Sequence, residues 1–427
     1  MLQPLLFRHA LGLLVGLALS AQPPSLIRAG RLLDVRTGQV RSDQGLLVKE
    51  GRIAATGPWT QLATAAPKEA RVLDLSGQLV LPGLIEAHTH VLLQGNRFGQ
   101  DYADQILKES VPTRTLRAAA AARAALSWGF TAMRDLGSEG AGYADVDLKR
   151  AIEAGVVPGP RLFVAGKAFS ATGTYPLQNY AWELDLPSGV RVVDGVDAIR
   201  VAVRDEVRRG ADWVKVYVDR GAFLGPDGRL RSMTNYRPDE LKAFVEEAHR
   251  LGKRTSAHVK GWDGIDAALS AGFDTVEHAD GFTDDLLDRA VKQGTFWCPT
   301  IYAGIWVADG RGPLGKKYPE ILAAAFHKGL AKGVRIALGS DAGAFPWTEN
   351  PAQELALMVE RGMTPLQAIQ SATLVAAELL GVRDLGSLEP GCHADLVALA
   401  EDPLKDITAL QRIRTVVKSG LVVRKDP

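Results

Sequence analysis

The chain has 427 residues, and its 50 basic and 49 acidic side chains leave a formal net charge of +1. This balance provides no field that would attract nucleic acid or an anionic membrane surface, so we expect neither as a partner. A hydrophobic content of 46% and a charged content of 23% are typical of a globular enzyme with a large core.

The N-terminal residues predict a secretory signal peptide over residues 1–21. Arg8 precedes a short apolar run at residues 10–19, and small residues surround Ala21. The run is too short for a membrane helix, which needs about 20 apolar residues. We therefore expect export to the periplasm or the extracellular space, with no stable membrane span after cleavage.

Two β-rich segments, residues 22–80 and 379–427, lie at the two ends of the chain. Both alternate apolar and polar residues and carry glycine at turn positions. Neither segment can bury its sheet faces alone, so we expect one small β-sandwich domain built from both ends. Cys298 and Cys392 fall in different predicted domains; an exported protein could pair them, but we expect two free thiols.

Residues 81–378 alternate short apolar strand candidates with segments of helical periodicity, such as residues 112–129, 196–211 and 238–253. This α/β alternation calls for a parallel sheet, and the eightfold count favours a (β/α)₈ TIM-like barrel over an open sheet. The strand candidates are LPGLIEAHTHV, FTAMRDLG, PRLFVAG, DWVKVYVD, RTSAHV, DTVEHAD, TFWCPT and RIALGSDA.

Residues that suit a metal site lie at the ends of these strand candidates. They are His88, His90, Lys215, His258, His278 and Asp341. His88 and His90 are two apart, so on a strand both side chains point to the same face. An isolated His-x-His pair can arise by chance. However, three further strand ends carry matching ligands, and the whole set predicts a metal centre at the C-terminal face of the barrel.

Lys215 needs its own explanation, because an ammonium group donates no lone pair and is repelled by a cation. One alternative is a structural lysine in a salt bridge. The other is carboxylation of the neutral amine by CO₂, which gives an anionic carbamate that bridges two metal ions. The negative charges of this carbamate, Asp341 and a bridging hydroxide would not fully neutralise two divalent ions. The residual positive charge would suit an anionic substrate. Asp341 could bind one ion and still accept a proton from bound water.

At these positions the chain resembles the amidohydrolase superfamily over almost its whole length. The resemblance is carried by GLLVKEGRIAATG, LPGLIEAHTH, AHVKGWDGIDAALSAGFDTVEH, GSDAG and GSLEPGCHADLVAL. The spacing is most similar to the imidazolonepropionase-like branch, which contains metal-dependent Xaa-Pro dipeptidases. The resemblance implies two divalent ions, usually Zn²⁺. One would be held by His88, His90, Lys215 and Asp341, and the other by Lys215, His258 and His278. Asp341 would be the general base and then the general acid.

The resemblance also suggests substrate-binding residues. Tyr236 stands where that branch has a tyrosine facing the substrate's α-carboxylate, although a residue packing locally at a helix entry is the alternative. Tyr217 and Arg220 lie just beyond Lys215; an arginine there could bind a carboxylate through two hydrogen bonds, or could be a solvated loop residue. The Thr174-Tyr175-Pro176 loop departs from the branch.

We therefore predict a binuclear amidohydrolase that cleaves a peptide or N-acyl amino acid amide bond through a metal-bridging hydroxide. Assembly of the chain into a homo-oligomer is compatible with this prediction. The alternatives are a lactone or organophosphate hydrolase on the same centre, a mononuclear deaminase or imidazolonepropionase-type enzyme, and a barrel that only binds ligands. Glu86, before the HxH pair, replaces the usual aspartate as a supporting residue, and Cys298 is expected to be a packing thiol rather than a ligand.

Overall fold

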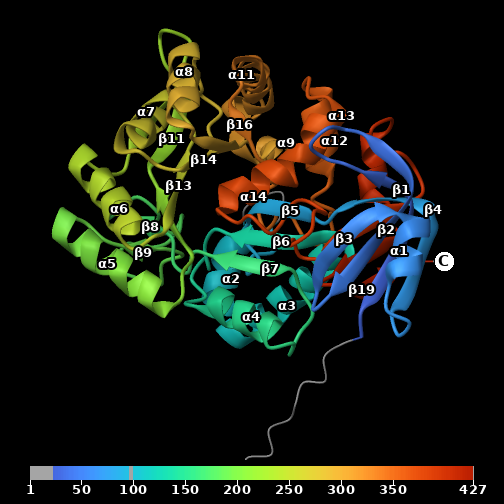
Figure 1. Ribbon diagram of the computed structural model, residues 1–427. Helices are drawn as coiled ribbons and strands as arrows, with labels where there is room; N and C mark the ends of the chain where they lie inside the picture. The colour runs from blue at the N-terminus through green and yellow to red at the C-terminus, as the bar shows by residue number, and fades with distance from the viewer. Residues whose placement is uncertain (1–22, 96–99, 427) are drawn as a thin grey trace, which may run out of the picture.

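The computed structural model describes residues 23–95 and 100–426 (Figure 1). The predicted signal peptide, residues 1–21, lies outside the described residues. In the part that is described, no helix has the length and apolar character that crossing a membrane requires.

Strands from both ends of the chain pair in one seven-stranded sheet, in the order β19-β18-β17-β4-β1-β2-β3. β4 is central: it pairs in parallel with β1, with Val80 opposite Leu32, and antiparallel with β17, where Val80 is opposite Ala398. Within the described residues these strands belong to a single sheet. The strand pairing therefore does not confirm the two facing layers of the predicted β-sandwich. The strands are β1 (Ser25–Leu33), β2 (Val40–Lys49), β3 (Arg52–Pro58), β4 (Arg71–Pro82), β17 (Leu396–Leu399), β18 (Thr415–Lys418) and β19 (Leu421–Lys425).

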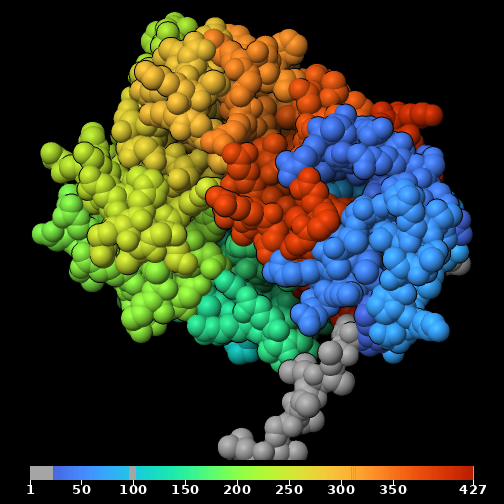
Figure 2. Space-filling model, viewed as in Figure 1, coloured from blue at the N-terminus to red at the C-terminus, as the bar shows by residue number. Residues whose placement is uncertain are grey.

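One face of this sheet is apolar, because apolar residues that point inward alternate with outward-pointing residues along the strands. Ile27, Leu46, Leu396 and Val417 are all buried in one cluster. The two chain ends therefore share a core that neither end could close alone. Figure 2 shows the blue N-terminal strands forming one side of the molecule, beside the orange and red C-terminal third.

All eight strand candidates of the central region are strands, and they pair in parallel in two sheets. The first sheet has the order β5-β6-β7, and the second has the order β16-β15-β14-β13-β10-β8-β9. The bounds are β5 (Leu84–Thr89), β6 (Phe130–Asp135), β7 (Arg161–Val164), β8 (Phe169–Ser170), β9 (Arg191–Val192), β10 (Trp213–Tyr217), β13 (Arg254–Val259), β14 (Thr275–His278), β15 (Phe296–Cys298) and β16 (Arg335–Ile336).

Main-chain hydrogen bonds join the edges of these two sheets. After β16, the Asp341 N–H donates to the His88 carbonyl at 2.8 Å and the His90 N–H donates to the Ala342 carbonyl at 2.7 Å. On the other side, the Asp212 N–H donates to the Val164 carbonyl at 2.7 Å, which links β7 to the start of β10. The first and last predicted strands of the α/β region are thus neighbours, although the eight strands are divided between two sheets.

Helices surround these strands on the outside (Figure 1). Their limits follow local signals: Ser110 caps α3 by accepting from the Thr113 N–H, and α5 ends at Gly210, whose left-handed φ of 119° suits glycine. The helices are α1 (Trp59–Ala65), α2 (Gln100–Lys108), α3 (Val111–Ser127), α4 (Ala144–Glu153), α5 (Val196–Arg209), α6 (Pro238–Arg250), α7 (Trp262–Ala271), α8 (Asp284–Gln293), α9 (Ile301–Val307), α10 (Gly312–Gly315), α11 (Tyr318–Lys332), α12 (Gln353–Glu360), α13 (Pro365–Ser371) and α14 (Leu374–Leu380).

A hairpin of β11 (Asp219–Leu224) and β12 (Leu230–Thr234) follows β10 and was not among the predicted elements. Its turn contains Gly225, Pro226, Asp227 and Gly228, a combination that marks a tight turn and was available in the sequence. The hairpin carries Arg220 beside the site.

Candidate metal centre

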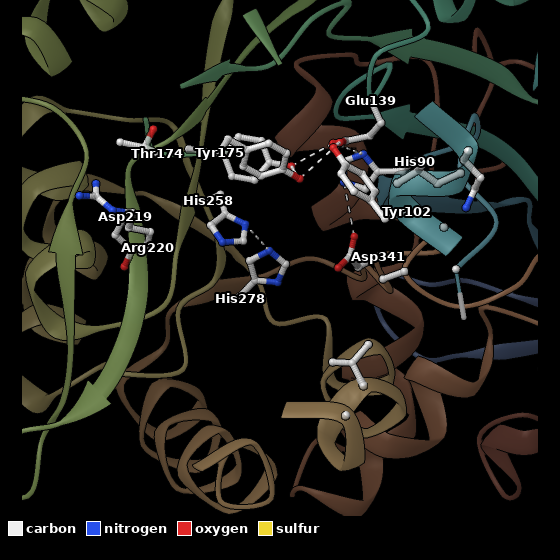
Figure 3. Close-up of a pocket in the computed structure, with 18 of the residues that line it drawn as sticks. His90, Tyr102, Glu139, Thr174, Tyr175, Asp219, Arg220, His258, His278 and Asp341 are labelled. Carbon is white, nitrogen blue, oxygen red and sulfur yellow. Dashed lines mark hydrogen bonds and ion pairs between the residues drawn. The ribbon is translucent and has the colours of Figure 1, made fainter. Parts of the chain in front are cut away.

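The predicted ligands all come from the ends of parallel strands, where the chain leaves the sheet. His88 lies on β5, Lys215 on β10 and His258 on β13, while His278 is the last residue of β14. His90 and Asp341 follow β5 and β16, and hydrogen bonds between their main chains hold these two segments together. The strand ends therefore bring residues from distant parts of the sequence to one place (Figure 3).

His88, His90 and Asp341 form a cluster in which the potential ligand atoms all lie within 4.8 Å of one another. The Nε2 atoms of both histidines are 3.5 Å from Asp341 Oδ1. Burial, assisted by Lys215, lowers the pKa of His88 to about 4, so its ring is neutral. Its Nε2 is buried and, among the described residues, has no hydrogen-bond partner. Acceptor atoms that converge in this way suit a cation between them.

His258 and His278 form a second pair, with His258 Nδ1 and His278 Nε2 only 2.9 Å apart. Burial holds the pKa of His278 well below its usual value, and Lys260 acts in the same direction. The other ring nitrogen, Nδ1, is 2.7 Å from Thr300 Oγ1, which fixes the ring. The His278 ring also packs 5.2 Å from the His88 ring, so the two clusters adjoin.

Lys215 is 1% exposed, and its Nζ has no hydrogen-bond partner in residues 23–95 and 100–426. Burial lowers its pKa to about 8, and the buried guanidinium of Arg134 acts in the same direction against the attraction of Glu277 and Asp341. The salt bridge that was the structural alternative for this lysine is not formed in the described part of the chain. A buried amine without a partner is costly as an ammonium ion, so its neutral form is favoured.

The orientation of His88 depends on Glu277 and Arg134, which the sequence reasoning missed. Glu277 Oε2 is 2.8 Å from His88 Nδ1, while its Oε1 accepts from Arg134 Nη2 at 2.9 Å. Burial by itself would raise the pKa of Glu277, but Arg134, His88 and Lys215 hold it well below its usual value. The carboxylate therefore keeps the proton on Nδ1 and leaves the Nε2 lone pair for a metal. An acid and an arginine inside otherwise apolar strands were the available signal.

Glu86 supports the same strand end, as predicted from its place before the HxH pair. Its Oε1 accepts from the His88 N–H at 3.0 Å and from the Ser340 N–H at 2.9 Å. Burial raises its pKa to about 8. This side chain joins β5 to the segment that carries Asp341.

A second missed acid, Glu139, lies on the other side of His90. Its Oε1 is 3.4 Å from His90 Nδ1 and accepts from the Tyr217 hydroxyl at 2.9 Å. Its Oε2 accepts from the Tyr102 hydroxyl at 2.7 Å and from the Tyr175 hydroxyl at 3.3 Å. Tyr217 and the Thr174-Tyr175-Pro176 loop thus contribute to the site through one buried carboxylate.

Next to these groups lies a cavity of about 430 Å³, lined among others by Tyr102, Tyr175, Arg220, His258 and Asp341. The Arg220 Nη1 donates to Asn235 Oδ1 at 2.7 Å, which fixes the guanidinium at the cavity wall. The volume suits a ligand of a few hundred daltons.

The structure does not bring Tyr236 to this cavity. Its ring packs 5.2 Å from Phe244 of α6, and it lines a different hollow between β12, α6 and α7. Only 5% of the residue is exposed, and its hydroxyl has no hydrogen-bond partner. This position, at the entry to α6, agrees with the alternative of local packing, and a role of Tyr236 in binding the substrate's carboxylate stays a prediction.

Both cysteines are free and buried. Cys298, on β15, has its Sγ 3.5 Å from Arg134 Nη2, and burial raises the pKa of its thiol well above the usual value. It is not part of the histidine and aspartate cluster. Its environment is that of a packing thiol.

Comparison with known proteins places this geometry in a family. The sequence profile of the amidohydrolase family matches residues 79–423. An ochratoxinase from Aspergillus niger is 31% identical over 364 residues, which are 79% of this chain and 73% of that protein. An imidazolonepropionase from Geobacillus kaustophilus is 25% identical over 100% of this chain and 99% of its own. The crystal structure of a Xaa-Pro dipeptidase with methionine bound in the active site is 31% identical, with a TM-score of 0.84 over 94% of this chain and 100% of that one.

The chain belongs to the amidohydrolase family. It is a hydrolase of C–N bonds, and its His88, His90 and Asp341 cluster fits the divalent metal ions that the family generally uses. The family relationship implies a TIM barrel with an additional domain, and the α/β content of the structure fits that architecture.

Proposed function

We propose that the protein is a binuclear metal-dependent amidohydrolase that cleaves a peptide or N-acyl amino acid amide bond. The relatives that are dipeptidases support this class of substrate. The observation that carries the proposal is the buried Nζ of Lys215, which has no hydrogen-bond partner among the described residues. It lies near two histidine clusters, and within each cluster the acceptor atoms face one another.

The chain's residues divide between two ions. His88, His90 and Asp341 would hold the first, and His258 and His278 the second, with Lys215 between them as a bridging carbamate. To form it, the Nζ lone pair bonds to the carbon of CO₂ and the nitrogen loses a proton to solvent, which leaves one negative charge. The neutral amine that this step needs is supported by the pKa of Lys215, lowered to about 8 by burial. Zn²⁺ is the ion we propose.

Bound there, a pair of such ions would acidify a water molecule to a nucleophile and polarise the substrate's carbonyl. The remaining steps belong to the protein. Asp341, whose side chain is 14% exposed, faces the cavity, so its carboxylate can take the proton from the attacking water and return it to the departing amine. Glu277 holds the His88 ring, and Arg220 offers a guanidinium to the substrate's carboxylate.

The remaining predictions complete this proposal. The eight parallel strands of residues 81–378 would form one barrel, joined at β5 and the segment after β16, with the sheet of residues 22–80 and 379–427 as the additional domain. The protein would be exported, its leader of residues 1–21 removed.

The test is metal analysis combined with an assay on dipeptides and N-acyl amino acids. We expect about two zinc equivalents per chain and release of free amino acid that stops on chelation and returns with Zn²⁺. His258→Ala should lose one equivalent and the activity. His249→Ala is the matched control, because His249 is an exposed residue of α6 paired with Asp274 at 2.8 Å. Metal-loaded protein that releases no amino acid from any amide would refute the proposal.

A further inference from the structure

One wall of the cavity is built from three tyrosines around the single buried carboxylate of Glu139. Tyr102 comes from α2, Tyr175 from the loop after β8, and Tyr217 from the end of β10. The rings of Tyr175 and Tyr217 pack 4.4 Å apart, and those of Tyr102 and Tyr175 6.1 Å apart. In Figure 3, Tyr102, Tyr175 and Glu139 lie on one side of the His258–His278 pair.

The hydroxyl groups of this wall donate their protons within it. Tyr102 donates to Glu139 Oε2 at 2.7 Å and Tyr217 donates to Glu139 Oε1 at 2.9 Å. The Tyr175 hydroxyl lies 3.3 Å from Glu139 Oε2 and 3.2 Å from the Tyr217 hydroxyl, so its proton also stays inside the wall. A phenol has one proton; once it is donated inside the wall, the oxygen can only accept from a ligand. The wall therefore offers acceptor oxygens and aromatic faces, and it is unsuited to stabilising an oxyanion.

Among residues 23–95 and 100–426, no arginine side chain forms an ion pair with the Glu139 carboxylate. Arg114 approaches the same loop, but its guanidinium donates to main-chain oxygens, at 2.7 Å to the Glu139 carbonyl and 3.3 Å to the Leu92 carbonyl. Acceptor oxygens, aromatic faces and an anionic charge together select a hydrogen-bond donor that carries a positive charge.

The opposite side of the cavity has the reverse character. Arg220 lies across the His258–His278 pair from Glu139 (Figure 3) and its guanidinium is held by Asn235. A ligand that spans this cavity meets a cation at one end and an anionic aromatic wall at the other, with the predicted metal ligands between them.

We infer that the substrate is a zwitterionic dipeptide with a free α-ammonium group, which the Glu139 and tyrosine wall binds. This rests on the proposed amide hydrolysis and narrows it: the unblocked dipeptide is the substrate class, and an N-acyl amino acid is the poorer one. The amide bond lies between the two charges of such a molecule, as the predicted metal ligands lie between Glu139 and Arg220.

The test compares a dipeptide with its N-acetylated form on the metal-loaded enzyme. We expect kcat/KM about 30-fold lower for the N-acetyl form, which has lost a charged hydrogen-bond donor. Tyr102→Phe should lower kcat/KM for the free dipeptide about tenfold and lower that for the N-acetyl form much less, because the Tyr102 hydroxyl bonds Oε2 rather than the Oε1 that faces His90.

Tyr143→Phe is the matched control. Its hydroxyl also donates to a buried carboxylate, Glu206 Oε1 at 3.0 Å, but Tyr143 does not line this cavity. It should leave both substrates unaffected. Equal turnover of free and N-acetyl dipeptides, or an equal loss on both in Tyr102→Phe, would overturn the inference and leave the proposed function standing. Turnover of neither substrate would refute the proposed function and the inference with it.

Discussion

The buried pair of Glu277 and Arg134 gives a sharp prediction, because both side chains are 0% exposed and one of them holds His88. Glu277→Gln keeps the shape of the side chain and removes its charge. The guanidinium of Arg134 is then left in the interior without an anionic partner. Removing one member of a buried ion pair costs about 3–5 kcal/mol. Since glutamine retains an acceptor oxygen, we expect the lower end, about 3 kcal/mol off the free energy of unfolding.

The same substitution weakens the metal centre. His88 Nδ1 loses an anionic acceptor at 2.8 Å, so its Nε2 becomes a poorer donor to the ion. Loss of such a supporting carboxylate typically lowers metal affinity about 10- to 100-fold. Urea unfolding of the metal-free protein measures the first effect, and competition with a chromogenic chelator for Zn²⁺ measures the second.

Two further variants separate these effects. Glu277→Gln combined with Arg134→Met removes the stranded charge, so stability should recover while zinc affinity stays low. Glu206→Gln is the control, since Glu206 is also a buried acid paired with an arginine, Arg191 Nη1 at 2.8 Å, remote from the centre. It should leave zinc affinity unchanged. A Glu277→Gln protein with wild-type stability and wild-type zinc affinity would show that the pair does not position His88.

Three other predictions follow from the site. Lys215→Ala should abolish activity, and a short-chain carboxylate should restore part of it. In wild-type protein stripped of CO₂, the carbamate should return faster as the pH rises through about 8, where the amine becomes neutral. Activity during bicarbonate titration and mass spectrometry check these outcomes. Arg220→Ala should raise KM for substrates with a free α-carboxylate while amidated substrates are unaffected, which steady-state kinetics measure; an equal effect on both would remove Arg220 from recognition. Tyr236→Phe should leave KM unchanged and raise the free energy of unfolding by about 1 kcal/mol, because it removes a buried hydroxyl without a partner; a selective rise in KM would return Tyr236 to carboxylate binding.

The sequence was sufficient to locate the strands and the polar residues at their ends because both are local signals. An apolar run followed by histidine or aspartate gives the strand and the position of the candidate ligand together, as at His278 and Asp341. The spacing of His88 and His90 also sets their common direction without knowledge of the rest of the fold.

Residues whose role depends on packing could not be located in this way. Glu139 lies in a loop, and its meaning appears only when tyrosines from three separate segments reach it. For Tyr236 the family resemblance suggested a place beside the substrate, whereas in the structure the ring packs against Phe244 at the entry to α6. The pairing of β4 with β17 in one sheet likewise depends on contacts between the two chain ends.

The main chain at two of the proposed metal ligands has a strained conformation, which supports a functional role for these residues. His278 and Asp341 have φ values of 65° and 62°, in the left-handed region that residues with a side chain rarely adopt. Such residues cost about 1 kcal/mol or more each and persist only where the surrounding structure holds them. Glycine would relieve the strain at either position but would remove the His278 imidazole or the Asp341 carboxylate from the candidate site. Strain retained at two proposed ligands on different strand ends is therefore consistent with selection for the proposed metal centre rather than for stability.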